Sequence, residues 1–214
     1  MAKLRVHNIA ISLDGFSTGE GQSLETPFGH AGGRLMEWFF PTRTFQSMSG
    51  NEGTTGADDD FAAAGWVGIG AEIMGRRKFG PQTGPWEDES WRGWWGDEPP
   101  FHTPVVVLTH HPRPDLSVGD TTFHFRDVTP AAALDLATDL AGGLDVRLGG
   151  GPTVIREFLE ADLVDYMHLV VAPIVLGRGV RLWDGLEGIE QRFDIEATVS
   201  DGGFVHQVFT RKPR

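Results

Sequence analysis

The sequence contains no cysteine, and this absence excludes several classes of chemistry. Without a thiol among its 214 residues, the chain has no disulfide bond, no thiolate nucleophile and no cysteine-ligated zinc. A cytoplasmic location is compatible with this composition and is expected. His110 and His111 are adjacent, but the sequence suggests no third ligand beside them, so no metal site is predicted.

Long apolar runs and positive charge are also scarce. No window approaches the roughly 20 apolar residues that span a bilayer, and the opening residues alternate as a first strand would, not as an export signal. The chain has 18 Lys and Arg against 30 Asp and Glu, a formal charge of −12. Nucleic acid and anionic membranes are therefore not expected partners, and an anionic ligand requires a local group of cations.

Apolar patterning and 29 glycines predict one α/β domain over residues 1–214, with a mostly parallel sheet and an antiparallel hairpin at its C-terminal edge. Thr129 as a cap and Pro130 as the first helical residue predict one helix clearly. We expect strands over residues 4–12, 67–75, 145–148 and 165–177, and a further strand within 104–113 that ends in a polar, basic turn. We also expect a terminal hairpin over 193–212, and helices over 34–40, 58–66, 129–142 and 152–161.

A glycine triplet follows the expected strand at 145–148. Gly149, Gly150 and Gly151 lack a Cβ, so a pyrophosphate could approach the backbone closely. Pro152 and Thr153 then begin a helix whose free N–H groups attract anions. The triplet matches neither the dinucleotide fingerprint nor the P-loop pattern. A turn that needs unusual dihedral angles explains it equally well.

Two further turns carry cations. IMGRRKFG, residues 73–80, places Arg76, Arg77 and Lys78 after a buried strand, where a helix start would favour a phosphate. In LTHHPR, Thr109 and Arg113 follow another buried strand, and open α/β sheets bind ligands beyond the carboxyl ends of their strands. Solvated polar turns are the alternative for both segments.

Together, three anion-binding turns on one sheet edge would suit an elongated, multiply phosphorylated nucleotide. NADPH offers a pyrophosphate for the glycine turn and a 2′-phosphate for the arginines. ATP is the rival ligand, but the P-loop lysine and its accompanying Mg²⁺ carboxylates are missing.

The segments SLDGF, IMGRRKF, VVVLTHHPR, RLGGGPTVIREFL and DYMHLVVAPIVLGRGVRLW resemble the dihydrofolate reductase-like superfamily. Within it, they are most similar to the C-terminal reductase domain of bacterial riboflavin-biosynthesis deaminase/reductases and its stand-alone relatives. The resemblance implies a three-layer sandwich, often homodimeric, that delivers a hydride from NADPH to a pyrimidine- or pteridine-like small substrate. The reaction would be similar to that of 5-amino-6-(5-phosphoribosylamino)uracil reductase.

The resemblance also implies roles for individual residues. Asp14 and Gly15 would begin the loop that closes over nicotinamide and substrate. The implied cofactor contacts are Gly149, Gly150, Gly151 and Thr153 at the pyrophosphate, with Pro152 opening the helix; Gly75, Arg76 and Arg77 at the cofactor phosphates; and Thr109 and Arg113 near the adenosine 2′-phosphate.

The substrate end of the expected site is less specific. Asp14 and Glu37 are candidate proton donors or substrate anchors, with a turn-forming aspartate and a solvated helix face as the alternatives. Trp38 could border the substrate or pack in the core. Alignment with dihydrofolate reductases on that tryptophan puts apolar Leu35 near the position of their pterin-binding acid, which argues against folate as substrate.

Two questions stay open. The segment over residues 85–102 holds four of the seven tryptophans, and it could form a lid, a dimer surface or a stacking surface for substrate. A non-catalytic or repurposed nucleotide-binding module of the same fold is the alternative to an enzyme, and an ATP-dependent transferase is a third possibility.

Overall fold

The computed structural model describes residues 2–213, and the chain folds into two compact units. The first unit holds the chain up to Arg5 together with Gly68–Leu163, and the second holds Val6–Val67 and the chain from Val164 onward. The boundary thus falls inside the first strand, β1 (Leu4–Ser12). The prediction of one domain over residues 1–214 stays a prediction.

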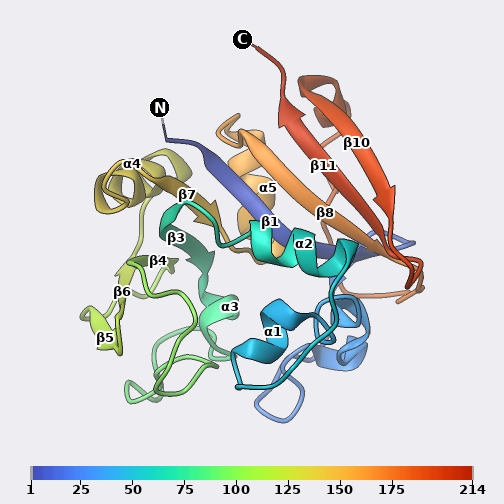
Figure 1. Ribbon diagram of the computed structural model, residues 1–214. Helices are drawn as coiled ribbons and strands as arrows, with labels where there is room; N and C mark the ends of the chain where they lie inside the picture. The colour runs from blue at the N-terminus through green and yellow to red at the C-terminus, as the bar shows by residue number, and fades with distance from the viewer. Residues whose placement is uncertain (1, 214) are drawn as a thin grey trace. The chain divides into compact units, whose positions relative to one another are not determined.

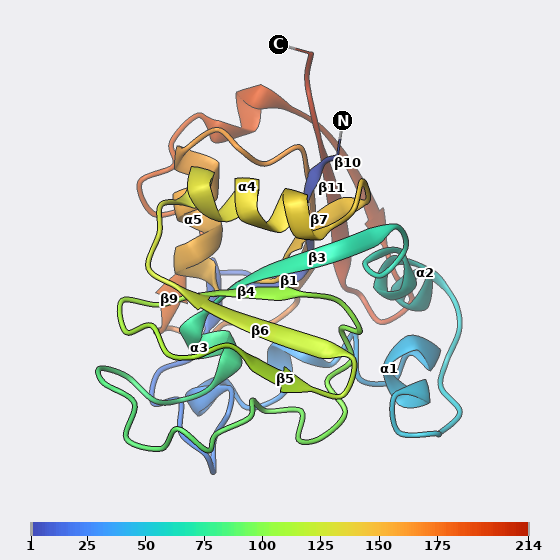
Figure 2. The ribbon, with the colours of Figure 1, turned by 90° about the vertical axis from the view of Figure 1, so that its left-hand side faces the viewer.

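The first unit is built on five neighbouring strands in the order β7, β3, β4, β6, β5. The first four run parallel to one another, and β5 runs antiparallel to β6. Figure 2 shows β3, β4, β6 and β5 side by side, with the helix α4 beside them. These strands are β3 (Ile69–Gly75), β4 (Val105–Leu108), β5 (Leu116–Val118), β6 (Thr121–Arg126) and β7 (Asp145–Leu148).

The helices of this unit form where capping and apolar spacing predict them. In α4 (Pro130–Leu140), the Thr129 side chain accepts the N–H of Ala132, which satisfies one of the free donors at the helix start. This helix packs against β3, β4 and β7. The stripe of α5 (Pro152–Glu160) buries Ile155, Phe158 and Leu159, at the spacing of one helix face. Between β3 and α5 the chain also forms a single turn, α3 (Arg76–Phe79).

The second unit contains four neighbouring strands in the order β10, β11, β8, β1, in which β10 pairs antiparallel with β11 and β11 pairs antiparallel with β8. Figure 1 shows β8, β11 and β10 side by side in orange and red. The predicted terminal hairpin is confirmed, with Phe193 opposite Arg211 and Val199 opposite Val205. The strands are β8 (Tyr166–Ala172), β10 (Phe193–Val199), β11 (Val205–Arg211), and a separate pair β2 (Phe16–Thr18) and β9 (Val180–Arg181).

Short helices complete the second unit, and its core gathers around Trp38. This side chain is 1% exposed and lies in one apolar cluster with Leu35, Ala62, Val170 and Phe204. Within the described part of the chain, no helix is long and apolar enough to cross a membrane. The helical segments are α1 (Arg43–Ser47), α2 (Ala57–Ala64), and the 3-10 turns η1 (Gly29–Ala31), η2 (Arg34–Met36) and η3 (Ile189–Arg192).

Two predicted elements are shorter than expected, and one hairpin was not predicted. The helix expected over 34–40 is only η2 followed by turns, because Pro41 disfavours helical backbone at the residue before it. The strand expected over 165–177 ends at Ala172, since Pro173 has no N–H for a ladder hydrogen bond. The β5–β6 hairpin lies in a polar stretch whose alternation, with Thr121 and Phe123 buried, was not recognised.

Candidate functional site

Three turns of the first unit lie at one edge of its parallel strands. Because β7, β3 and β4 are parallel neighbours, their carboxyl ends meet at the same edge. The N–H of Gly75 donates to the Gly150 carbonyl at 2.8 Å, and the N–H of Gly149 donates to the Ile73 carbonyl at 2.8 Å. The glycine turn and the basic turn are therefore in direct contact.

Each glycine of the triplet has a different environment. A Cβ at Gly149 would overlap the Glu72 carboxylate and the Lys78 ammonium group, so this glycine makes room for an ion pair. Gly150 has a φ of +100°, and the peptide bond between Gly150 and Gly151 is cis. A Cβ at Gly151 would meet no described atom within 4 Å. Gly151 is thus the member of the triplet that faces open space.

The first turn of α5 presents backbone donors beside Gly151. Pro152 opens the helix, Thr153 follows in an exposed position, and no acidic side chain occupies this turn. The N–H groups of a first turn have no acceptor inside the helix, and the helix dipole adds partial positive charge there. An anion at Gly151 would meet both effects, which is how helix starts bind phosphates.

A buried ion cluster lies beneath Gly149. The Glu72 side chain is 2% exposed; its Oε1 accepts from Lys78 Nζ at 2.7 Å, and its Oε2 lies 3.6 Å from Arg147 Nε. Burial lowers the pKa of the Lys78 ammonium group, and the Glu72 carboxylate opposes that shift. The sequence pattern predicts that Lys78 and Arg76 surround one phosphate. Side chains two positions apart on a helical turn, however, point in directions that differ by about 200°. Lys78 therefore pairs with Glu72.

Arg76 and Arg113 meet at Trp86, a residue of the tryptophan-rich segment. The Arg76 guanidinium carbon lies 3.8 Å from the Trp86 ring centroid, and that of Arg113 lies 4.3 Å from it. Arg113 also lies 4.3 Å from the Phe125 ring. Burial lowers the pKa of both guanidinium groups. The structure thus brings together two of the three arginines predicted at the cofactor phosphates.

The remaining predicted phosphate contacts flank this pair. Arg77 is exposed, and α3 is one turn long, so the helix-start dipole expected to favour an anion there is weak. Thr109 is 8% exposed at the end of β4, where its Oγ1 accepts the His111 N–H at 3.1 Å. Thr109 therefore shapes the turn that carries Arg113.

In the second unit, Asp14 organises a turn. Its Oδ1 accepts from Ser12 Oγ at 2.6 Å and from the Leu176 N–H at 3.1 Å, and its Oδ2 accepts from the Gly177 N–H at 2.7 Å. The Ser12 hydroxyl and these backbone donors lower the pKa of Asp14 to about 2. A carboxylate ionised in this way is a poor proton donor at neutral pH. Gly15 follows with a φ of +85°, which favours glycine.

The other two predicted substrate residues lie after η2. Glu37 is exposed, and Trp38 is buried within the core cluster. These positions agree with the structural alternatives for both residues, and the roles proposed for Asp14, Gly15, Glu37 and Trp38 at the substrate stay predictions.

Sequence reasoning missed a buried polar chain in the second unit. His168 Nε2 lies 3.0 Å from His206 Nδ1, and His206 Nε2 lies 2.7 Å from Asp58 Oδ1. At the other end, His168 Nδ1 lies 3.0 Å from Asn8 Oδ1. The Phe61 ring stacks on both imidazoles at 7°. Burial, followed by the nearby His206, lowers the pKa of His168 to about 3. The clue was two histidines on apolar strands that pair in the sheet.

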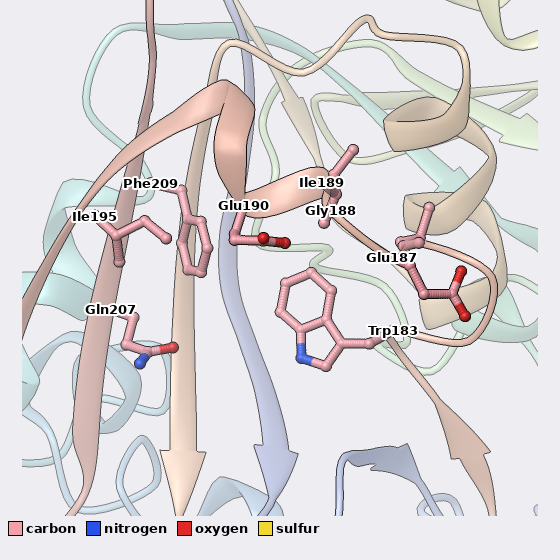
Figure 3. A pocket seen from close by; sticks show the side chains of 9 residues that line it. Trp183, Glu187, Gly188, Ile189, Glu190, Ile195, Gln207 and Phe209 are labelled. Carbon is pink, nitrogen blue, oxygen red and sulfur yellow. The ribbon is translucent and has the colours of Figure 1, made fainter.

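A hollow of about 430 Å³ opens among residues of η3, β10 and β11 and the segment before them. Figure 3 shows Glu190 beside the rings of Trp183 and Phe209, whose centroids are 6.0 Å apart. The lining also includes Glu187 and Gln207. Two carboxylates disfavour a phosphate group, so this hollow is not a candidate for the cofactor phosphates.

Comparison with known proteins places the chain in a family. The sequence profile of the RibD C-terminal domain matches residues 5–204, which confirms the predicted resemblance. Among curated proteins no significant sequence match was found.

Solved structures share the fold at low sequence identity. A Shewanella sp. PV-4 protein assigned to riboflavin biosynthesis is 22% identical, with a TM-score of 0.60 over 100% of both chains. A pyrimidine reductase-like protein from Corynebacterium diphtheriae is 16% identical, with a TM-score of 0.53 over 100% of this chain and 93% of that one. Enterococcus faecalis dihydrofolate reductase, complexed with NADP(H) and RAB-propyl, is 15% identical, with a TM-score of 0.54 over 99% and 97%. These likenesses confirm the predicted dihydrofolate reductase-like three-layer α/β sandwich.

Proposed function

Because the chain belongs to the family of RibD C-terminal domains, we propose that it is an NADPH-dependent reductase. It would transfer a hydride to a pyrimidine- or pteridine-like or related small substrate, in a reaction similar to that of 5-amino-6-(5-phosphoribosylamino)uracil reductase. One observation carries the proposal: an open glycine at a helix start and two stacked arginines follow parallel strands that end at the same sheet edge.

Different residues of this sheet edge bind different parts of the cofactor. Gly151 lets the pyrophosphate approach the backbone, and the N–H groups at the start of α5 bind it. Arg76 and Arg113 bind the 2′-phosphate through charge-assisted hydrogen bonds, for which the planar guanidinium is well suited. The bound cofactor supplies the hydride, while the protein supplies orientation and electrostatics.

We assign the turn at Asp14 and Gly15 a positioning role within its own unit. Three hydrogen bonds to the Asp14 carboxylate fix this turn, so Asp14 positions the loop, and the proton for reduction comes from another donor or from water. We extend the proposal to a homodimer, as the family resemblance implies, and to a cytoplasmic location, with which the composition without cysteine is compatible.

A non-catalytic nucleotide-binding module of the same fold is the second candidate. It is favoured by the state of Asp14, whose carboxylate is held ionised by three hydrogen bonds and is therefore a poor proton donor for a reduction. The test is whether a pyrimidine- or pteridine-like substrate oxidises NADPH, which is measured as a loss of absorbance of the reduced nicotinamide. Such oxidation would support the enzyme over the non-catalytic module.

We expect NADPH to stabilise the fold in thermal unfolding. At ~100 times its dissociation constant, a ligand that binds the folded state alone adds roughly 2.7 kcal/mol, which raises Tm by roughly 5–10 °C for a chain of this size. NADH should give a smaller shift at the same concentration because it lacks the 2′-phosphate, and ATP should give a smaller shift still. No shift with millimolar NADPH would contradict the proposed function.

A further inference from the structure

A segment of the tryptophan-rich region is fastened to the two arginines. We call residues 84–91 the strap. Arg113 Nη1 donates to the Glu89 carbonyl at 3.0 Å, and Nη2 donates to the Trp91 carbonyl at 2.8 Å. Arg76 Nη1 donates to the Gly84 carbonyl. Three guanidinium N–H groups therefore hold the strap along its whole length.

Trp86 sits on the arginines as a nucleotide base would. Its half-buried indole stacks on the guanidinium groups, and its Nε1–H donates to the His111 carbonyl at 2.6 Å. The rings of Phe79 and Phe125 meet Trp86 edge-on, with ring centroids 6.0 Å and 5.5 Å from that of Trp86. A flat heteroaromatic ring with an N–H donor, whose face meets guanidinium groups and whose surroundings are aromatic, has the recognition chemistry of a purine.

The hydrogen-bond acceptors beside Arg76 and Arg113 are a poor match for two guanidinium cations. Their guanidinium groups donate to neutral carbonyl oxygens of the strap, and Arg76 Nε and Nη2 are buried without an acceptor among the described residues. A buried charged donor left unpaired is costly, and charge-assisted bonds to phosphate are about twice as strong as neutral ones. A phosphate would therefore be a better partner than the strap.

We propose that Trp86 occupies the adenine position of the nucleotide site, and that the strap must release Arg76 and Arg113 before the cofactor binds. This inference rests on the proposed function, since it assigns the arginine pair to the adenosine end of NADPH. When the cofactor binds, the two arginines exchange both of their partners: adenine replaces the indole of Trp86, and the 2′-phosphate replaces the strap carbonyls. Trp86 thus lowers the apparent affinity for NADPH by competing for its own site.

The test compares Trp86→Ala with Trp183→Ala by isothermal titration with NADPH. Trp183 is the control, because it is also a half-buried tryptophan and its ring contacts Phe209 and not the strap. We expect Trp86→Ala to bind NADPH about 10-fold more tightly than the wild type, from the loss of a competing cation–π contact and hydrogen bond. Trp183→Ala should bind as the wild type does.

Equal or weaker binding by Trp86→Ala would overturn the inference, weaker binding meaning that adenine stacks on the indole. Hydrogen–deuterium exchange of the wild type is a second test, and it does not depend on whether the variant folds. Exchange in residues 84–91 should rise on addition of NADPH, and unchanged or slower exchange would equally overturn the inference. If no form of the protein binds millimolar NADPH, the proposed function itself fails. Binding by Trp86→Ala alone would support both proposals.

Discussion

Replacing Glu72 by alanine is expected to lower the free energy of unfolding by about 3–5 kcal/mol, the range for removal of one partner from a buried ion pair. Glu72 is 2% exposed and accepts from Lys78 Nζ at 2.7 Å, with Arg147 close to its other oxygen. Its removal leaves two cations without the carboxylate that offsets their desolvation. Urea denaturation at neutral pH measures the loss.

Two further variants separate charge from volume. Glu87→Ala removes an exposed carboxylate and should change stability by less than about 0.5 kcal/mol. Adding Lys78→Met to Glu72→Ala should recover part of the loss, because one buried charge is then removed together with its partner. A loss below about 1 kcal/mol for Glu72→Ala would contradict the ion-cluster account of Gly149, whose missing side chain leaves room for this pair.

Acid is expected to unfold the protein through its buried histidines. The pKa of His168 is about 3 in the folded chain against 6.5 as the ordinary value, so between those pH values the unfolded state binds a proton that the folded state does not. The contribution of His168 to the free energy of unfolding is therefore at its full value above pH 6.5, and it falls by about 1.4 kcal/mol per pH unit below that pH. The pKa of His206 is lowered by burial in the same direction, against the Asp58 carboxylate.

Urea denaturation between pH 7.5 and 4.5 tests this. His168→Gln should be less stable than the wild type at pH 7.5 but lose stability less steeply with falling pH, by about one proton. The ring of His168 faces Asn8, His206, Phe61 and Trp38. His110→Gln, at a side chain that is 93% exposed, is the matched control and should keep the wild-type slope. Equal slopes for His168→Gln and the wild type would contradict the account.

Local signals predicted the elements that form the cofactor edge. Pro152 and the apolar spacing of α5 fixed that helix, and Thr129 with Pro130 fixed the start of α4. Parallel strands then required that Gly75 and Gly149 lie at one edge, which their hydrogen bonds to Gly150 and Ile73 confirm. These features depend on short-range chemistry and on sheet geometry alone.

The features that sequence reasoning missed depend on contacts between distant residues. Trp86 lies in a segment without regular structure and contacts Arg113, which is 27 positions further along the chain; no periodicity of the sequence predicts such a contact. Likewise, His168 and His206 meet because β8 and β11 pair in one register. The prediction of a helix over 34–40 was wrong for a local reason: the apolar pattern favours a helix, but Pro41 disfavours helical backbone just before it, and only the turn Arg34–Met36 forms.

The central claim, that this sheet edge binds NADPH through its 2′-phosphate, is tested most directly by one titration series. The dissociation constants of NADPH and NADH are measured for the wild type and for Arg76→Ala, with the exposed Arg77→Ala in parallel. Because strap release affects both cofactors alike, the NADPH-to-NADH ratio is the informative quantity. We predict that Arg76→Ala loses about 10- to 100-fold of the preference for NADPH, the value of one charge-assisted hydrogen bond. Equal losses for both cofactors, or no preference in the wild type, would contradict the account.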